Sequence, residues 1–210
     1  MALMSRYPDK HFDLAIVDPP YGIGASKRTG TTYKSGKGGK GFKSMKLYEA
    51  KTWDNAIPNK TYFNELFRVS KNQIIWGGNY FPLPLVKGWI FWHKKIANAT
   101  TENFADGELA WTSFDKTARY FMYDWVGFGG INSGEKRQHP TQKPVALYKW
   151  LLEKYAKEGD KILDTHLGSG SIAIACHDYN FDLTACELDK EYFDKAMQRI
   201  NNHTAQIKMF

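Results

Sequence analysis

The sequence predicts an α/β protein built on a doubly wound, mainly parallel sheet. Two observations support this fold class: short apolar runs alternate with segments of helical periodicity, and the expected helices are about ten to fifteen residues long. The length of 210 residues suits one domain of ordinary size, so we expect residues 1–210 to fold as a single domain.

The first half of the chain supplies most of the expected strands. Residues 12–17 (FDLAIV) are apolar, and the strand ends at Asp18-Pro19-Pro20 because two prolines cannot continue a parallel strand. Asn59 begins a helix with apolar residues near one face. Further strands are expected over residues 73–76, 88–92 and 108–114. Residues 115–138 have no sustained period and are expected to be irregular.

The C-terminal third alternates most regularly. Pro144 opens a helix that Gly159 ends, because proline favours the first helical position and glycine a left-handed cap. Strands are expected over residues 161–163 and 182–186, the first running into Asp164 and the second into Glu187. The helices that follow them are expected to run from Ser169 or Ser171 to about Tyr179, and from about Glu191 to Asn201.

Composition excludes several classes of protein. No run approaches the roughly 18 apolar residues of a membrane span, and the first residues lack the apolar stretch of a signal peptide. The two cysteines, Cys176 and Cys186, are too few for a disulfide framework or a zinc ligand set. We therefore expect a cytoplasmic protein with reduced, buried thiols, no membrane partner and no metal.

The net charge of +7 is concentrated in one stretch. Residues 27–51 hold eight basic residues, one acid (Glu49) and five glycines. A basic, glycine-rich loop over residues 22–51 predicts a polyanionic partner and disorder without it, although charge alone equally allows a solvated insertion with no ligand. The candidate binding residues are Lys27, Arg28, Lys34, Lys37, Lys40 and Lys43.

A nucleotide-binding pattern follows the strand at residues 161–163. Gly168 and Gly170 allow the backbone to approach a ligand, and Glu187, 23 residues after Asp164, is placed to bind a ribose. The loop GSGS is not a pyrophosphate-binding G-x-G-x-x-G turn, and Asp164 would repel phosphate but suit an ammonium group. The cofactor should therefore join a ribose to an aminoacyl group, as S-adenosylmethionine does. A plain tight turn between strand and helix is the alternative.

A second polar turn, Asp18-Pro19-Pro20-Tyr21, lies at another strand end of the same sheet. A carboxylate, a proline carbonyl and an aromatic ring suit a planar exocyclic amine, because the acceptors bind its N–H groups and the ring stacks on its base. Taken alone, the turn could equally be a capped turn with Tyr21 in the core.

These motifs together resemble those of the DNA amino-methyltransferases, specifically the permuted beta class, in which the catalytic motif precedes the cofactor motif. The matching segments, which follow in order over nearly the whole chain, are DPPYG (18–22), HPTQKP (139–144), LDTHLGSGS (163–171) and ACELD (185–189) followed by Tyr192. The resemblance implies the Rossmann-like methyltransferase fold, S-adenosylmethionine as cofactor and methyl transfer to adenine N6. In that family Asp before Pro-Pro-Tyr usually goes with adenine N6, and Ser with cytosine N4.

Carried over by position, the resemblance implies catalytic roles for Asp18, Pro19, Pro20 and Tyr21. The implied cofactor contacts are Thr141, Lys143, Asp164, His166, Gly168, Ser169, Gly170 and Glu187. Asp164 and Lys143 would hold the aminoacyl end, and His166 stands where the family commonly has an aromatic residue beside the cofactor.

The resemblance also implies partners. Double-stranded DNA would be bound with its target base flipped out of the helix, and residues 94–138 would form a short target-recognition region. A homodimer and a cognate restriction nuclease, within a restriction-modification system, are further partners of this class. Family members usually carry an additional strand with Gly-Asp before the catalytic strand, and residues 1–11 offer none, so we expect one edge strand to be missing there. A cytosine-N4 or RNA methyltransferase, or a catalytically impaired nucleic-acid-binding remnant of the fold, are the alternatives.

Overall fold

A computed structural model of the chain describes residues 1–27, 51–94, 105–123, 125, 135 and 138–206. The strands in these residues are β1 (Phe12–Val17), β2 (Ser70–Trp76), β3 (Trp89–His93), β4 (Gly107–Thr112), β5 (Arg119–Met122), β6 (Lys161–Asp164) and β7 (Asp182–Ala185). The α-helices are α1 (Lys60–Val69), α2 (Val145–Tyr155), α3 (Ser171–Asp178) and α4 (Lys190–Thr204). Three short 3-10 helices are η1 (Met4–Arg6), η2 (Ala25–Lys27) and η3 (Gly78–Tyr80).

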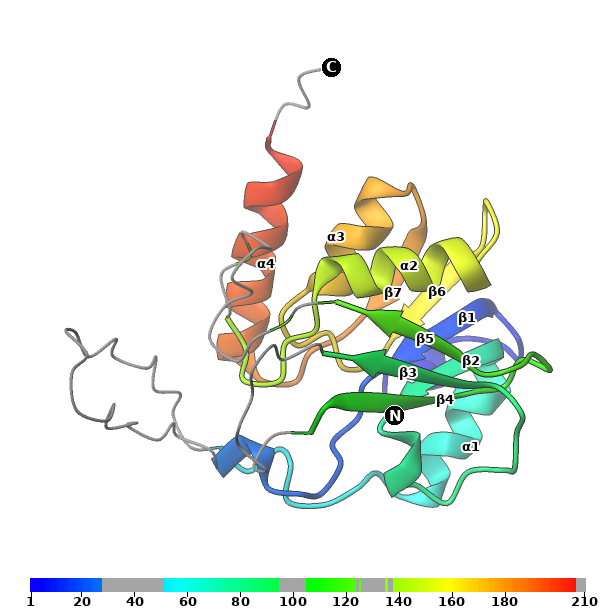
Figure 1. Ribbon diagram of the computed structural model, residues 1–210. Coiled ribbons are helices and arrows are strands. Elements are labelled where there is room, and N and C mark those ends of the chain that lie inside the picture. Colours follow the sequence, from blue (N-terminus) through cyan, green and yellow to red (C-terminus); the bar gives the residue numbers. More distant parts are fainter. Residues whose placement is uncertain (28–50, 95–104, 124, 126–134, 136–137, 207–210) are drawn as a thin grey trace.

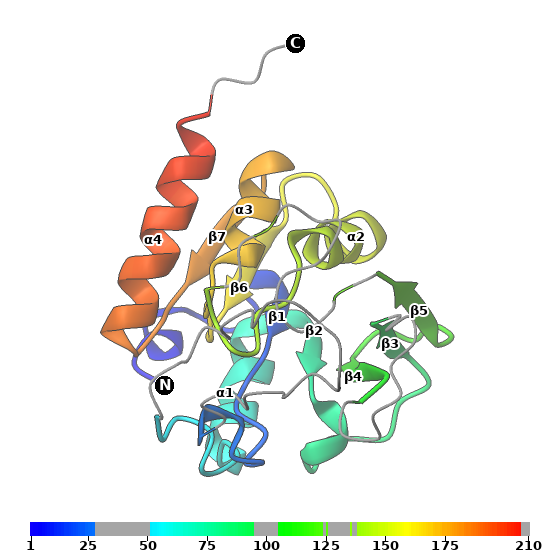
Figure 2. The same cartoon turned by 60° about the vertical axis from the view of Figure 1, so that its left-hand side comes forward.

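The described strands form one mixed sheet in the order β5-β3-β4-β2-β1-β6-β7 (Figure 2). Strand β4 runs antiparallel to both of its neighbours, β2 and β3, whereas every other adjacent pair is parallel. Residues 1–11 contain η1 and no strand, so β7 lies at the edge of the sheet. The predicted α/β class with a mainly parallel sheet is confirmed.

Helices cover both faces of this sheet, with α2 and α3 on one side and α1 on the other (Figure 1). Leu14 and Ile16 of β1 pack into the core beneath α2 and α3. Ala15 and Val17, which alternate with them, pack into the core beneath α1. Because both faces of β1 are covered, its residues other than Asp13 are apolar. None of the described helices is long and apolar enough to cross a membrane.

The starts of α1 and α3 agree with the sequence, whereas α2 differs from it at both ends. The Asn59 side chain accepts a hydrogen bond from the Tyr62 backbone N–H at 3.0 Å and caps α1, and α3 begins at Ser171. The prediction that Gly159 ends α2 is wrong, because the chain leaves the helix at Ala156 in an extended conformation. Gly159 has φ +84° and serves the turn that leads into β6. Pro144 is the N-cap rather than the first helical residue.

Strand β5 corrects the expectation that residues 115–138 are irregular. It pairs in parallel with β3, and its residues are mostly exposed. An exposed edge strand needs no alternation of apolar and polar residues, so the sequence carries no periodic signal for it. With β4, it also places part of the 94–138 segment inside the sheet.

The carboxyl ends of β1, β2, β6 and β7 meet at one edge, because these strands are parallel. We call this the carboxyl edge. Since β4 is antiparallel, its first residues lie there too, beside the end of β3. The fold therefore brings Asp18, Asp164, Glu187 and the start of β4 to the same side of the sheet.

Candidate active site

Asp18 follows β1 directly, and both oxygens of its carboxylate are engaged. The Tyr21 hydroxyl donates a hydrogen bond to Asp18 Oδ1 at 2.6 Å. The Lys143 ammonium donates one to Asp18 Oδ2 at 2.5 Å. Of the two prolines between Asp18 and Tyr21, Pro19 is buried and Pro20 is half-buried. The structure thus brings together the predicted catalytic turn and Lys143, for which the family resemblance implies a cofactor contact.

Two further charged residues continue this contact. Lys143 Nζ lies 3.0 Å from Glu108 Oε2, and Lys94 Nζ lies 2.6 Å from Glu108 Oε1. Glu108 reaches the carboxyl edge because β4 is antiparallel, and Lys94 reaches it because β3 ends there. The result is a row of alternating charges, Lys94–Glu108–Lys143–Asp18, in which the Lys143 side chain is only 2% exposed. The sequence motifs gave no signal for Glu108 or Lys94.

Burial and neighbouring charges set the protonation of this charge row. Burial raises the pKa of Asp18, and the Glu108 carboxylate adds to the rise, while the Lys143 ammonium opposes it. Burial also acts to raise the pKa of Glu108, but the ammonium groups of Lys143 and Lys94 outweigh it and lower that pKa to about 2. Glu108 is therefore firmly ionised, and Asp18 is the carboxylate of the row that takes up a proton more readily.

The ring of Tyr21 is held by the turn after β2. It stacks on Tyr80 with ring centroids 5.1 Å apart and planes inclined by 13°. A Cβ atom at Gly77 would lie 2.1 Å from Tyr21 Cε1, and Gly77 has φ +68°. Only glycine fits there, because a side chain would overlap the ring and the backbone is left-handed. Asp18, Gly77 and Tyr80 together fix the orientation of Tyr21.

Asp164, at the end of β6, is a buried carboxylate in a different setting. Its Oδ1 accepts a hydrogen bond from the His166 backbone N–H at 2.9 Å, and it forms no ion pair with any described residue. Burial raises the pKa of Asp164 to about 8, and the carboxylates of Asp18 and Glu187 contribute to the rise. A buried carboxylate that lacks a cation is suited to bind the ammonium group of a ligand.

The glycine loop after Asp164 fits the close approach of a ligand. Gly168 has φ +54°, and among the described residues a Cβ atom there would meet only the His166 carbonyl oxygen at 3.8 Å, so these residues do not crowd it. Gly170, with φ +75°, instead packs against Ile200 of α4. The Gly168 backbone N–H donates to Glu187 Oε2 at 2.8 Å. The structure therefore joins the loop to the carboxylate that the sequence assigned to the ribose.

Ser169 contacts α4. It is buried, and the guanidinium of Arg199 in α4 donates to its carbonyl oxygen at 2.9 Å. Arg199 also donates to Ser171 Oγ at 2.9 Å and pairs with Glu135 at 2.8 Å. These contacts tie α4 to the glycine loop at Ser169 and Ser171.

Thr141 and its neighbours pack against the start of α4. Thr141 Oγ1 lies 3.1 Å from His139 Nδ1. The His139 ring packs edge-on against Tyr192 with centroids 4.2 Å apart, and it also contacts Trp53 at 5.5 Å. The HPTQKP segment thereby lies against the start of α4. Trp53 and His139 were not among the predicted site residues.

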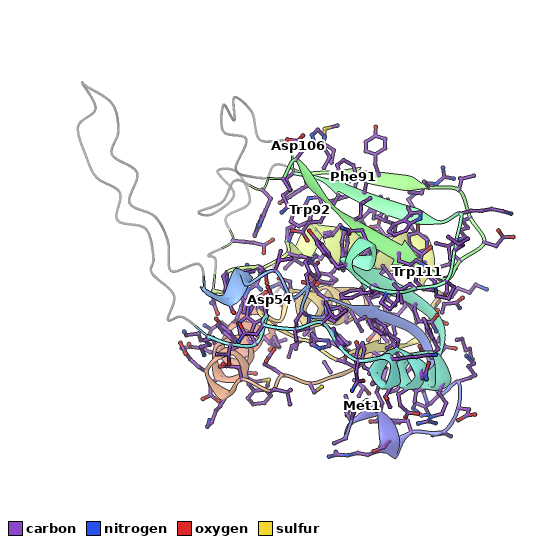
Figure 3. The ribbon with its side chains drawn as sticks, turned by 90° about the horizontal axis from the view of Figure 1, so that it is seen from below. Met1, Asp54, Phe91, Trp92, Asp106 and Trp111 are labelled. Carbon is purple, nitrogen blue, oxygen red and sulfur yellow. The ribbon has the colours of Figure 1, made fainter. Side chains whose placement is uncertain are left out.

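The basic loop begins and ends beside these residues. The Lys51 N–H donates to the Ser26 carbonyl oxygen at 3.1 Å, and Lys51 Nζ pairs with Asp189 at 2.6 Å. Asp54, which Figure 3 shows beside η2, accepts hydrogen bonds from the backbone of Gly22 and Ala25. Lys27 is the last residue of η2. The other predicted DNA-binding residues, Arg28, Lys34, Lys37, Lys40 and Lys43, lie outside the described residues.

Comparison with known proteins adds a family match and two similar sequences. A family model described as DNA methylase matches residues 121–198, a span that includes the glycine loop and excludes Asp18 and Tyr21. The type II methyltransferase M.HpaI of Haemophilus parainfluenzae is 23% identical over 95% of this chain and 71% of its own length. The type II methyltransferase M.XycI of Xanthomonas campestris pv. cyanopsidis is 26% identical over 57% of this chain and 47% of its own length.

Solved structures share the fold over nearly the whole chain. M1.HpyAVI, solved as a complex with SAM, has a TM-score of 0.55 and 21% identity, covering 94% of this chain and 92% of that one. The cytosine-N4-specific PvuII DNA methyltransferase has a TM-score of 0.54 and 10% identity, covering 96% and 87%. The chain thus has the fold of solved DNA methyltransferases, and its residues 121–198 match the DNA methylase family.

Proposed function

We propose that the chain is an S-adenosylmethionine-dependent methyltransferase that acts on adenine N6 in double-stranded DNA. One observation carries the proposal: Asp18 directly follows β1 and Asp164 is the last residue of β6, and these two strands are adjacent and parallel. A turn suited to an amine and a loop suited to a nucleoside with an aminoacyl group therefore share one edge of the sheet. The matching family and the type II methyltransferases named above support this assignment.

The residues at the carboxyl edge fit the cofactor. Asp164 is a buried carboxylate that forms no ion pair within the described residues, Glu187 follows β7, and the described residues leave Gly168 uncrowded. We infer that Asp164 binds the ammonium group and Glu187 the ribose hydroxyls. S-adenosylmethionine, when bound, supplies a methyl group that is attached to a positively charged sulfur. This sulfur is a good leaving group, because it departs as a neutral thioether.

Asp18 would act on the amine of the target base. Each carboxylate oxygen can accept two hydrogen bonds, and Tyr21 and Lys143 use one on each oxygen, so acceptor capacity remains. These same contacts hold the carboxylate in place, and alignment of the amine with the methyl group would supply most of the acceleration. The Pro19 carbonyl is the second acceptor, and the Tyr21 ring stacks on the base. The proton that the amine loses passes to Asp18.

The choice of adenine over cytosine rests on Asp18, the first residue of the Asp-Pro-Pro-Tyr turn. The exocyclic amines of adenine and cytosine present the same N–H donors, so the acceptors described above would suit either. The cytosine-N4-specific PvuII enzyme has the same fold, which makes cytosine N4 the second candidate.

The test combines methyl transfer with cofactor binding. With tritiated S-adenosylmethionine and duplex DNA, Asp18→Ala should lose at least about a hundredfold in transfer, the range for removing a group that handles a proton. Its affinity for S-adenosylmethionine should stay within a few-fold of the parent. Asp115→Ala is the matched control, because Asp115 is 86% exposed and pairs with Lys87 away from the carboxyl edge.

Two outcomes would contradict the proposal. A parent chain that binds DNA but transfers no methyl group would be a nucleic-acid-binding remnant of the fold. If Asp18→Ala lost cofactor binding together with transfer, Asp18 would be a structural residue and the catalytic assignment would fail.

A further inference from the structure

A chain of hydrogen bonds leads from the core to His166 in the glycine loop. The Tyr62 hydroxyl, on α1, lies 2.7 Å from Thr165 Oγ1. Thr165 Oγ1 in turn lies 2.9 Å from His166 Nδ1. The rings of Tyr62 and His166 also meet edge-on with centroids 5.5 Å apart. Two residues, Tyr62 and Thr165, therefore hold the imidazole in position.

The positions of the hydroxyl protons decide which imidazole nitrogen carries hydrogen. Tyr62 is 7% exposed, and Thr165 is its hydroxyl's partner within the described part of the chain. If Nδ1 donated to Thr165, either the threonine or the tyrosine proton would lack an acceptor among the described residues. Every proton is used when Tyr62 donates to Thr165 and Thr165 donates to Nδ1. The hydrogen of the imidazole then resides on Nε2.

The imidazole is neutral, and its Nε2–H is available to a ligand. Burial lowers the pKa of His166 to about 4, so the ring carries no charge at neutral pH. His166 is half-buried, and Nε2 makes no hydrogen bond with any described residue. The backbone N–H of the same residue donates to Asp164, so the ring starts next to the expected ammonium site.

The other side-chain donors in the HPTQKP segment that the resemblance implies as cofactor contacts, Lys143 and Thr141, are engaged. The Lys143 ammonium lies between the carboxylates of Asp18 and Glu108. The Thr141 hydroxyl lies 3.1 Å from His139 Nδ1. A carboxylate on the same carbon as the ammonium would still need a donor close to Asp164.

We propose that His166 donates a hydrogen bond from Nε2–H to the carboxylate of the cofactor's aminoacyl group. This inference rests on the proposed function, because it assumes that S-adenosylmethionine is the ligand. His166 would then replace the family's apolar contact with a polar one, and the Tyr62–Thr165 pair would act as positioning residues that fix its tautomer.

The tautomer can be measured without any cofactor. Nitrogen-15 NMR of the full chain, with the His166 signals identified by their loss in His166→Phe, should show the neutral Nε2–H form at pH 7. In Tyr62→Phe the Thr165 hydroxyl is free to accept from Nδ1, so the share of the Nδ1–H form should rise. Tyr148→Phe is the control, since Tyr148 is an equally buried tyrosine on α2 and should leave the tautomer unchanged. An Nδ1–H form in the parent would overturn the inference.

Binding of two ligands that differ only in the carboxylate identifies the acceptor. By calorimetry, His166→Phe should bind S-adenosylmethionine about tenfold or more weakly than the parent, as expected for a lost hydrogen bond to a charged group. Its affinity for decarboxylated S-adenosylmethionine should stay within about twofold. Equal losses for both ligands, or no loss for either, would overturn the role of His166. A parent chain that binds neither ligand would instead contradict the proposed function.

Discussion

Asp18 is a partly buried carboxylate and Asp164 a buried one, and their surroundings differ in a way that suits two roles. Lys143 supplies a cation 2.5 Å from Asp18, whereas Asp164 forms no ion pair within the described residues. Asp18 is therefore held in one geometry, as an acceptor for a neutral amine requires. Asp164 is stabilised by a proton or by a bound cation, as a site for an ammonium group requires.

The raised pKa of Asp164 predicts a pH dependence of stability. Its pKa of about 8 in the folded state exceeds the value of about 3.9 in an unfolded chain, so the folded state holds a proton that the unfolded state has lost. The stabilisation is complete below the lower pKa and is lost as the pH rises through 8. The pKa of His166, lowered to about 4, has the opposite effect between about pH 4 and 6.5, so the Asp164 effect is isolated above that range.

Asp164→Asn should therefore be more stable than the parent at pH 8, because asparagine mimics the protonated form. In urea unfolding between pH 6.5 and 8, the free energy of unfolding of the parent should fall by up to about 1.4 kcal/mol per pH unit relative to that of the variant. Asp115→Asn should show the parent's slope. Parallel stability curves for the parent and Asp164→Asn would contradict the buried, proton-holding carboxylate.

Glu108 should tune the acid side of the activity profile. Its carboxylate raises the pKa of Asp18 and shares the Lys143 ammonium, so Glu108→Gln should lower the pKa of Asp18. Methyl transfer by the variant should then persist to lower pH than in the parent, as measured by the pH dependence of kcat. Glu153→Gln is the control, since Glu153 is an exposed residue of α2. An acid limb that stays in place or moves to higher pH would show that Asp18 is not the group that titrates.

At the scale of elements, the turn between β2 and η3 shapes the catalytic turn. A Cβ atom at Gly77 would overlap the Tyr21 ring, and the backbone there is left-handed. Gly77→Ala should therefore displace Tyr21 and lose methyl transfer, in addition to a backbone cost of about 1–2 kcal/mol. Gly159→Ala is the matched control, because Gly159 has φ +84° and nothing within 4 Å of its Cβ position. In urea unfolding, the free energy of unfolding of Gly159→Ala should fall by the backbone cost alone. The variant should keep full activity. Equal activity in the two variants would contradict the packing role of Gly77.

The elements that the sequence predicted well are those whose surroundings impose a simple pattern. Strands β1 and β6 are buried on both faces, so each reads as an apolar run that ends at a polar turn. Asn59 could be predicted as the start of α1, because asparagine is a preferred N-cap residue whose side chain accepts a hydrogen bond from a backbone N–H of the first turn. Strand β5 was missed because it is exposed at an edge, and the early end of α2 was missed because Gly159 acts in the following turn.

The charge row beside Asp18 could not be predicted, because it depends on strand direction. Glu108 lies at the carboxyl edge only because β4 runs antiparallel to its neighbours, and strand order is not encoded in a local pattern. Lys143 was recognised as a site residue from its motif, but its ion pair with Asp18 joins residues that are distant in sequence. The motifs therefore indicated which residues gather at the edge, and the tertiary fold determines which of them touch.

At the scale of the whole molecule, the excess positive charge lies in a segment whose two ends are anchored at the carboxyl edge. Lys51 is held by Asp189 and Glu191 at the start of α4, and Asp54 caps the turn at Gly22. The anchors place the basic loop's ends beside the site that we propose for the base and the cofactor. Phosphate contacts from the loop would add affinity that does not depend on sequence and falls with salt.

The triple variant Lys37→Ala, Lys40→Ala and Lys43→Ala should therefore bind duplex DNA with a salt slope reduced by up to about three, since each neutralised phosphate contributes about 0.9. Its affinity for S-adenosylmethionine and its sequence preference should not change. A second triple variant, Lys87→Ala, Lys154→Ala and Lys157→Ala, removes the same charge from exposed residues near the opposite edge of the sheet and should keep the parent's slope. Identical slopes for the parent and the first variant would rule out phosphate binding by the loop.

The identity of the methylated nucleoside decides between adenine N6 and its alternatives. Duplex DNA incubated with the chain and tritiated S-adenosylmethionine is digested to nucleosides, which are separated and identified by mass spectrometry. We predict that the label appears in N6-methyl-2′-deoxyadenosine and is lost with Asp18→Ala. Label in N4-methyl-2′-deoxycytidine would contradict the adenine assignment, and unlabelled DNA would contradict the methyltransferase itself.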